Sequence, residues 1–262
     1  MRLGQNFLSD PNLLDAIVRD AGVGAKDCVL EVGVGEGVLT ERLAAVTDQV
    51  HVIELDRGLE PLLWQIEKLG NVNIIWADAV KFDLSSLDPA PTAMVANLPY
   101  SVATPVIMRS IFELPSIRTW SVMVQKEIAD RLRAGPGSKT YGSPSVLAQL
   151  AGEVNLVRKV SRTVFRPQPR VDSAIVSIRR NGPGPDEHTR TVVRAAFSHR
   201  RKALPRSMDM AIPGTLLQAR AALEELGIDR GIRAEAVSPQ QFAAFSAMID
   251  LPADDSELVT ER

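Results

Sequence analysis

The sequence predicts an α/β fold with a seven-stranded, largely parallel sheet, followed by a small all-helical domain. Short β-branched runs alternate with helical stretches through residues 28–180, and the run 181–186 after them is rich in glycine and proline. Such alternation is typical of βαβ units, whose parallel sheet is covered on both faces. Glycine and proline interrupt regular structure, so they mark a boundary. We therefore place the α/β domain at residues 1–182 and the helical domain, with a polar tail, at 183–262.

The expected strands are short runs rich in valine and isoleucine. The last two are joined by a proline-rich segment, 166–169, which is too short for the crossover that parallel strands need. These two should therefore form an antiparallel hairpin at the sheet edge. The expected strands are residues 28–32, 50–55, 72–76, 93–97, 121–125, 154–164 and 171–178.

The expected helices have apolar residues about 3.6 positions apart and are bounded by glycine or proline. Most lie between the strands, and the rest follow the boundary and make up the second domain. The expected helices are residues 38–46, 59–69, 102–112, 127–133, 145–152, 191–197, 216–226 and 239–249.

The composition is that of an ordinary globular protein, with 45% hydrophobic and 24% charged residues. No run approaches the roughly 18 apolar residues of a membrane span, and the first residues do not resemble a secretory signal. We expect a soluble, cytoplasmic protein. The single cysteine, Cys28, lies in an apolar run and should be buried, and the three histidines have no ligand spacing, so we expect no metal site.

A glycine-rich loop follows the first expected strand. It reads Glu31-Val32-Gly33-Val34-Gly35-Glu36-Gly37 and opens the next helix, so Gly33 and Gly35 would let a ligand approach backbone N–H groups. A dinucleotide fingerprint needs its third glycine one residue later, and a phosphate-binding P-loop needs a Gly-Lys-Ser/Thr triplet that is absent. An acidic residue before G-x-G-x-G resembles the S-adenosylmethionine loop of class I methyltransferases. A tight strand-to-helix turn without a ligand is the alternative.

Two carboxylates follow the next strands. Glu54, at the end of the second strand, could accept hydrogen bonds from both ribose hydroxyls of a bound nucleoside, as NAD sites also do. Asp78-Ala79 follows the third strand, where the resemblance to class I methyltransferases implies a place near the adenine amino group. A surface acid is the alternative for Asp78.

The fourth strand ends in Asn97-Leu98-Pro99-Tyr100, which we call the acceptor tetrapeptide. An adenine amine is a poor nucleophile because its lone pair is delocalised into the ring. If the Asn97 side-chain oxygen and the Leu98 carbonyl accept its two N–H bonds, they favour a pyramidal nitrogen and no general base is required. Pro99 stiffens the turn, and Tyr100 offers a face for an extruded base. A plain proline turn, or another amine or amide substrate, also fits this pattern.

Positive charge is concentrated in one stretch of the chain. The formal net charge is -2, yet residues 158–202 contain twelve basic and three acidic residues. Concentrated lysine and arginine are typical of phosphate binding, although a solvated face is the alternative.

Three motifs together closely resemble the ribosomal RNA adenine N6-dimethyltransferase family. They are Leu3-Gly4-Gln5-Asn6-Phe7-Leu8, the segment 95–100 around the acceptor tetrapeptide, and the segment 165–173, which begins Phe165-Arg166-Pro167. The resemblance covers nearly the whole chain, including segments 124–127, 141–146 and 197–204. Within the family it is closest to the bacterial small-subunit branch, which implies a class I, Rossmann-like methyltransferase sheet.

The resemblance also implies which residues contact the target base, the cofactor or the RNA. Tyr100 and Phe165 would stack the target base, although a core aromatic is the alternative for Phe165. The basic residues would contact rRNA phosphates. The implied contacts of S-adenosyl-L-methionine, whose product is S-adenosyl-L-homocysteine, are Gln5, Asn6, Leu8, Gly33, Gly35, Glu54, Asp78, Ala79 and Asn97, and the implied RNA contacts are Arg158, Arg162, Arg166, Arg170, Arg200, Arg201 and Lys202.

The implied function is dimethylation of two adjacent adenines in the 3'-terminal hairpin loop of 16S rRNA during small-subunit biogenesis, by a monomer without metal or membrane association. One alternative is the related 23S rRNA methyltransferase that confers macrolide resistance, but its members commonly read Asn-Ile-Pro-Tyr or Phe, whereas this chain has Leu98. Another is a ribosome-assembly or transcription factor that binds RNA without methylating it, against which Glu54 and Asn97 argue.

Finally, Pro205 is expected to break the helix around it, where relatives have an arginine-asparagine pair.

Overall fold

The computed structural model describes residues 6–8 and 10–252, which divide into two compact units. Among these residues, one unit contains those up to residue 129 together with 153–181, and the other contains 130–152 together with those from 182 onward. The second break lies beside the glycine- and proline-rich run, where the sequence places its boundary. Residues 130–152, which the sequence assigns to the first domain, belong instead to the helical unit. The assignment of catalysis to one unit and rRNA binding to the other stays a prediction.

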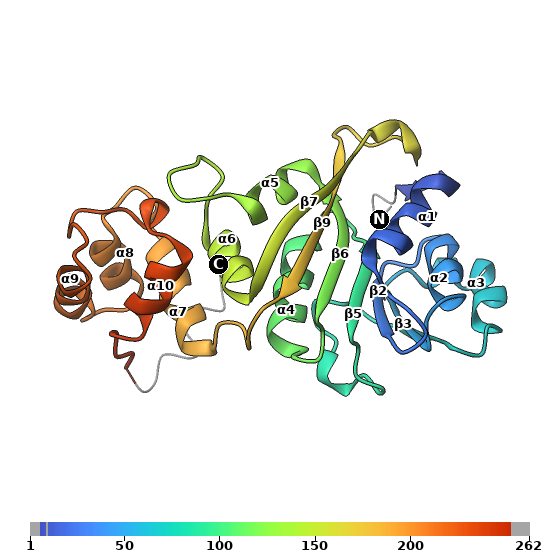
Figure 1. Ribbon diagram of the computed structural model, residues 1–262, viewed down its shortest axis with the longest axis horizontal. Coiled ribbons are helices and arrows are strands. Elements are labelled where there is room, and N and C mark those ends of the chain that lie inside the picture. Colours follow the sequence, from blue (N-terminus) through green and yellow to red (C-terminus); the bar gives the residue numbers. More distant parts are fainter. Residues whose placement is uncertain (1–5, 9, 253–262) are drawn as a thin grey trace. The chain divides into compact units, whose positions relative to one another are not determined.

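The first unit is built on a seven-stranded sheet (Figure 1). Its parallel strands are β2 (Cys28–Val32), β3 (Gln49–Glu54), β4 (Val72–Trp76), β5 (Ala93–Asn97) and β6 (Thr119–Gln125). The expected strands match these within two residues, because buried parallel strands are nearly continuous apolar runs.

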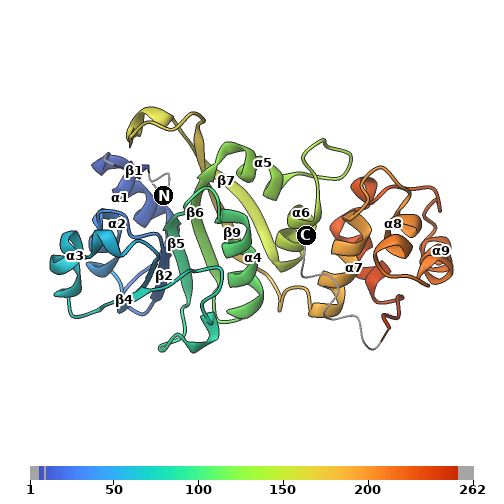
Figure 2. The same cartoon turned by 180° about the vertical axis from the view of Figure 1, so that it is seen from behind.

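The strand order is β4-β3-β2-β5-β6-β9-β7, with β9 (Ser173–Arg180) antiparallel to β6 and β7 (Gly152–Val160) at the edge. Figure 2 shows the sheet from behind, with β4 toward its other edge. The chain runs outward from β2 to β4 and then returns to β5 beside β2. Ligands of open α/β sheets bind at such a reversal, outside the carboxyl ends of the strands.

Five helices accompany the sheet: α1 (Pro11–Ala21), α2 (Val38–Ala44), α3 (Glu60–Glu67), α4 (Ala103–Glu113) and α5 (Lys126–Arg133). The sequence prediction missed α1, which contacts α2, β5 and β6. Its signals were present. The Asp10 carboxylate accepts a hydrogen bond from the Leu13 N–H, Pro11 begins the helix, and Gly22 ends it in the left-handed conformation.

A two-stranded ribbon was also missed. β1 (Phe7–Leu8) pairs antiparallel with β8 (Phe165–Arg166), so that Phe7 lies opposite Arg166 and Leu8 opposite Phe165. Two-residue strands have no periodic pattern. Their pairing depends on contacts between distant parts of the chain, which the sequence pattern does not express.

The second unit is helical. It contains α6 (Ser143–Ala151), α7 (Glu187–Phe197), α8 (Leu204–Ala211), α9 (Leu216–Glu225) and α10 (Pro239–Ser246). Aromatic rings fill its centre: the Phe197 ring lies 5.9 Å from that of Tyr141 and 5.6 Å from that of Phe242. The buried Tyr141 hydroxyl donates to the Val237 carbonyl at 2.7 Å. Packing of α6 on α7 and α10 places residues 143–151 in this unit.

The expectation for Pro205 was wrong. Pro205 lies in the first turn of α8, after a turn that separates α7 from α8. The N–H groups of a first helical turn have no helical partner, so a proline there removes no hydrogen bond and its fixed φ suits the helix. Pro205 therefore begins a helix rather than breaking one.

Short 3-10 turns complete the fold: η1 (Arg57–Leu59), η2 (Leu84–Ser86), η3 (Arg162–Val164) and η4 (Ala234–Ala236). Over the part of the chain that the structure describes, no helix is long and apolar enough to cross a bilayer.

Candidate active site

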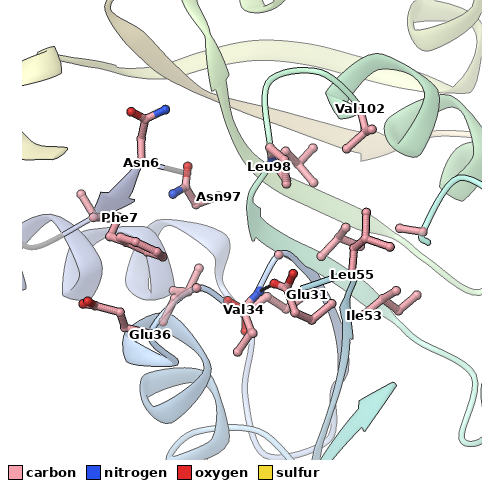
Figure 3. A pocket seen from close by; sticks show the side chains of 18 of the residues that line it. Asn6, Phe7, Glu31, Val34, Glu36, Ile53, Leu55, Asn97, Leu98 and Val102 are labelled. Atoms are coloured by element: carbon pink, nitrogen blue, oxygen red, sulfur yellow. Dashed lines mark hydrogen bonds between the residues drawn. The ribbon is translucent and has the colours of Figure 1, made fainter. Parts of the chain in front are cut away.

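A cavity of about 160 Å³ opens at the carboxyl ends of the parallel strands, at the reversal of strand order (Figure 3). Its walls come from β1, from the loops after β2, β3 and β4, and from the acceptor tetrapeptide after β5. Gln5, an expected cofactor contact, lies outside the described residues. The structure brings the following predicted site residues together around the cavity: Asn6, Leu8, Gly33, Gly35, Glu54, Asp78, Ala79, Asn97, Leu98, Pro99 and Tyr100.

The glycine loop contacts two other walls of this cavity. Gly33 has φ of +84°, and a Cβ there would lie 3.1 Å from the Pro99 ring. Gly35 has φ of +56°, and a Cβ there would lie 3.2 Å from the Phe7 ring. Only glycine combines these backbone angles with such close approach. The loop therefore leaves its backbone open to a ligand while the acceptor tetrapeptide and β1 pack against it.

The Glu54 carboxylate is held in one orientation. One oxygen accepts from the Val34 N–H at 3.0 Å, and the other accepts from the Asp56 N–H at 2.8 Å. The residue is only 7% exposed, and it lines the cavity. Each carboxylate oxygen retains acceptor capacity, since two oxygens offer about four lone-pair sites. The geometry therefore fits a ligand with two neighbouring hydroxyls.

A second carboxyl in the cavity wall, Glu31, is 1% exposed and accepts a hydrogen bond from the Thr40 hydroxyl at 2.7 Å. Burial raises the pKa of Glu31 from 4.5 to about 8, and the nearby Glu54 charge adds to this increase. Glu31 is thus mainly a neutral acid at pH 7. Sequence reasoning identified this residue only as the acid that precedes the glycines.

The acceptor tetrapeptide is fixed by backbone and side-chain contacts. The Leu98 N–H donates to the Met123 carbonyl at 3.1 Å, and the Val102 N–H donates to the Pro99 carbonyl at 3.1 Å. The Tyr100 and Ser173 hydroxyls share a hydrogen bond of 2.8 Å, and burial raises the pKa of the Tyr100 phenol. Among the described residues, neither the Asn97 side-chain oxygen nor the Leu98 carbonyl has a hydrogen-bond partner. Both acceptors are available to a substrate, and Figure 3 shows Asn97 beside Asn6.

Phe165 does not line this cavity. Its ring is 2% exposed and belongs to the core cluster that also contains Leu8, its partner in the ribbon of β1 and β8. The structure therefore supports the alternative that the sequence left open, a core aromatic. Stacking of a base on Phe165 would require this ribbon to move.

The predicted RNA contacts fall into two groups. Three arginines have internal partners: Arg158 donates to Asp20 at 3.1 Å, Arg162 to the Arg170 carbonyl at 3.2 Å, and Arg200 to Glu235 at 2.8 Å. The hydrogen bond from Arg158 lowers the pKa of Asp20 below its ordinary value. Arg200 also donates to the Lys139 carbonyl at 2.6 Å. All seven side chains are exposed, but within the described residues those of Arg166, Arg170, Arg201 and Lys202 make no hydrogen bond or ion pair.

Sequence reasoning missed some cavity residues. Phe7 belongs to a motif that the sequence analysis quoted and lines the cavity beside Leu8, but nothing in the motif separated its role from that of its neighbours. Leu55 directly follows Glu54, and Val102 lies two residues after Tyr100; both line the cavity. Within residues 6–8 and 10–252, no three histidine, cysteine or acidic side chains are grouped as metal ligands.

Comparisons with known proteins agree with this geometry. The model of a family described as ribosomal RNA adenine dimethylase matches residues 1–251. The ribosomal RNA small subunit methyltransferase A of Rubrobacter xylanophilus is 42% identical over 247 residues, which cover 93% of this chain and 92% of that protein.

Solved structures confirm the predicted Rossmann-like α/β fold. A dimethyladenosine transferase from Plasmodium falciparum has a TM-score of 0.76 at 25% identity, over 91% of this chain and 95% of that chain. The 23S rRNA methyltransferase ErmE has a TM-score of 0.69 at 28% identity, over 94% of this chain and 100% of that chain.

Proposed function

The chain belongs to the ribosomal RNA adenine dimethylase family, and we propose that it dimethylates N6 of two adjacent adenines in the 3'-terminal hairpin loop of 16S rRNA. The methyl donor that we propose is S-adenosylmethionine, which leaves as S-adenosylhomocysteine. The observation that carries the proposal is the position of two available acceptors, on Asn97 and Leu98, at the wall of the strand-end cavity.

The cavity residues fit this donor. Gly33 and Gly35 keep backbone open where a side chain would collide with Pro99 or Phe7. Glu54 presents a fixed carboxylate suited to ribose hydroxyls, and Asp78 lines the same cavity on the loop after β4. When bound there, S-adenosylmethionine supplies an electrophilic methyl group on a sulfonium.

The acceptor tetrapeptide activates the amine by geometry. The Asn97 side-chain oxygen and the Leu98 carbonyl each accept one N–H of the target adenine, which favours a pyramidal nitrogen with its lone pair toward the methyl group. Because these acceptors are neutral, they hold the amine without removing its proton before attack. Tyr100 offers a face to the extruded base, and its hydrogen bond to Ser173 fixes the ring.

The small-subunit substrate is favoured over 23S rRNA by two observations. The relative of 42% identity is a small-subunit methyltransferase by name, whereas the 23S rRNA methyltransferase is 28% identical. The tetrapeptide also has Leu98 where 23S enzymes commonly have isoleucine. We also propose that the enzyme acts as a monomer, in the cytoplasm where ribosomal subunits are assembled.

The experiment is methyl transfer with a choice of substrate. The protein is incubated with labelled S-adenosylmethionine and either undermethylated 30S subunits or protein-free 23S rRNA, and the labelled nucleotides are mapped. We expect label on two adjacent adenines of 16S rRNA. Label on 23S rRNA alone would refute the proposed substrate, and RNA binding without label on either RNA would instead support a non-catalytic assembly or transcription factor.

A further inference from the structure

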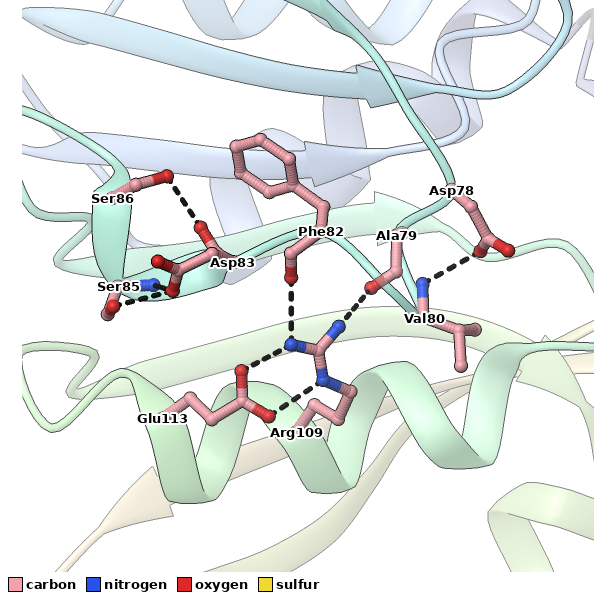
Figure 4. A network of polar contacts seen from close by, with 9 residues as sticks. All are labelled: Asp78, Ala79, Val80, Phe82, Asp83, Ser85, Ser86, Arg109 and Glu113. Atoms are coloured by element: carbon pink, nitrogen blue, oxygen red, sulfur yellow. Dashed lines mark hydrogen bonds and ion pairs between the residues drawn. The ribbon is translucent and has the colours of Figure 1, made fainter.

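The loop after β4 is attached to α4 by one arginine, Arg109 (Figure 4). Its guanidinium donates to the Ala79 carbonyl at 2.8 Å and to the Phe82 carbonyl at 2.8 Å. Within this loop, the Asp78 carboxylate accepts from the Val80 N–H at 2.9 Å. Two loop carbonyls therefore face the helix, while Asp78 and Ala79 line the cavity.

Glu113 holds Arg109 in this orientation. The Arg109 Nε lies 2.7 Å from one Glu113 oxygen, and an Nη nitrogen lies 2.5 Å from the other. The Arg109 side chain is only 22% exposed. A guanidinium has five donors in a fixed plane, so it can bind a carboxylate with two hydrogen bonds and still donate to two carbonyls. A lysine has three donors at one point and cannot reproduce this arrangement.

Arg109 thereby connects two walls of the cavity. α4 begins at Ala103, three residues after the acceptor tetrapeptide ends at Tyr100, and Val102 between them lines the cavity. Arg109 lies less than two turns further along the same helix. Backbone bonds fix the loop at Ala77 and within residues 78–82, and Arg109, which does not line the cavity itself, connects it to α4. The position of Asp78 and Ala79 relative to Asn97 therefore depends in part on this side chain.

We propose that Arg109, oriented by Glu113, is a positioning residue that places Asp78 and Ala79 for recognition of the adenine amino group of the methyl donor. This inference rests on the proposed function. Recognition of an amino group by a carboxylate requires correct placement within a few tenths of an ångström, because hydrogen bonds weaken steeply with poor geometry. Without Arg109 the loop keeps Asp78 but loses its fixed position.

The chain contains a matched control at the other end of α4. The Arg180 guanidinium also donates to backbone carbonyls, at 2.7 Å to Ile117, 2.9 Å to Ile111 and 3.3 Å to Leu114. None of these four residues is among those that line the described cavity. Arg180→Lys therefore removes the same kind of contact without touching the loop after β4.

The experiment compares two ligands by calorimetry: S-adenosylhomocysteine, and its inosine analogue with a 6-oxo group in place of the 6-amino group. The wild-type protein should prefer the adenine ligand. In Arg109→Lys we expect this preference to fall about tenfold, because Asp78 loses its placement. In Arg180→Lys we expect the wild-type preference even if the melting temperature falls. Glu113→Gln, which keeps the arginine but loosens its orientation, should lower the preference by a smaller factor.

The outcomes separate this inference from the proposed function. Absence of S-adenosylhomocysteine binding by the wild-type protein would refute the proposed donor. If the wild-type protein binds and discriminates, and Arg109→Lys discriminates equally, Arg109 is structural only and the inference is wrong. An equal loss in Arg180→Lys would also overturn it. If Arg109→Lys does not fold, the Glu113→Gln variant provides the test. The ratio of its affinities for S-adenosylhomocysteine and for the inosine analogue should fall, and an unchanged ratio counts against the inference.

Discussion

The cavity at the strand ends and the basic stretch 158–202 differ in how well their residues could be predicted. Every predicted cofactor or catalytic residue within the described residues lines the cavity except Phe165. In the basic stretch all seven predicted contacts are exposed; Arg158, Arg162 and Arg200 make internal contacts, whereas the side chains of Arg166, Arg170, Arg201 and Lys202 make none within the described residues.

The difference has a physical cause. A motif at the end of a parallel strand has its position set by the sheet, because the carboxyl ends of neighbouring strands meet at one edge. A lysine or arginine in a charge-rich stretch has no such constraint. Its long side chain takes whatever carboxylate or carbonyl the fold brings within reach. Spacing after strands therefore predicts a site, while a count of charges predicts only a region.

The most direct test of the cavity is Asn97→Ala. We expect the rate of methyl transfer to fall about 10³-fold, because one of the two acceptors that we propose for the target amine is lost. RNA affinity should stay within a few-fold of wild type. Single-turnover rates and RNA binding isotherms provide both measurements. Asn155→Ala, on the exposed side of β7, is the control and should change neither. Equal loss of rate and RNA affinity in Asn97→Ala would show that Asn97 acts chiefly in binding or structure.

The sequence placed Phe165 at the site, but the structure places it in the core. Substituting Phe165 tests which placement is correct. Phe165→Ala should lower the free energy of unfolding by about 3 to 5 kcal/mol, since it leaves a cavity in a packed cluster. Phe165→Leu should cost less than about 1.5 kcal/mol. Urea denaturation measures both. A loss below about 1 kcal/mol in Phe165→Ala would contradict a core role and restore the stacking hypothesis.

The buried Glu31 carboxyl in the cavity wall should make the free energy of unfolding depend on pH. The pKa of Glu31 is raised by burial from 4.5 to about 8 in the folded protein, so the folded state binds the proton more tightly than the unfolded state. The contribution is fully present below pH 4.5 and is lost as the pH rises through about 8. Glu31→Gln, which stays neutral, should remove this dependence, on the order of 5 kcal/mol between the two limits.

Urea denaturation of the ligand-free wild-type and Glu31→Gln proteins at pH 5 and at pH 8.5 measures this effect. The variant should gain relative stability at the higher pH. An equal change with pH in both proteins would show that Glu31 does not keep its proton in the folded state.

The basic stretch is tested by comparing arginines that differ in their partners. Replacing exposed Arg201 and Lys202 together by alanine should lower RNA affinity about tenfold or less and reduce the salt dependence by about two phosphate contacts. Arg200→Ala should chiefly lower the melting temperature, because Arg200 holds Glu235 and the Lys139 carbonyl. Fluorescence anisotropy across a salt series distinguishes the two variants. An equal change in salt slope would remove the distinction between arginines with and without internal partners.

The parallel strands and most helices could be predicted because their signals are local. β2, β4 and β5 have the expected bounds, since each is a buried apolar run. The helix 191–197 in fact begins at Glu187, where the Asp186 carboxylate accepts from the Thr189 N–H at 2.8 Å. That cap was readable in the sequence, as were the caps of α1. The signals for the start of α7 and for α1 are therefore present in the sequence, and the prediction overlooked them.

The sequence by itself determined the chemistry of the cavity. Glycines, Glu54, Asp78 and the acceptor tetrapeptide each follow a strand of one parallel sheet, so order along the chain becomes proximity in space. Only the tertiary structure decided that β1 pairs with β8 over a buried Phe165, that Arg109 attaches the loop after β4 to α4, and which arginines are paired. Such contacts join residues far apart in the chain, and no local periodicity, cap or turn residue records them.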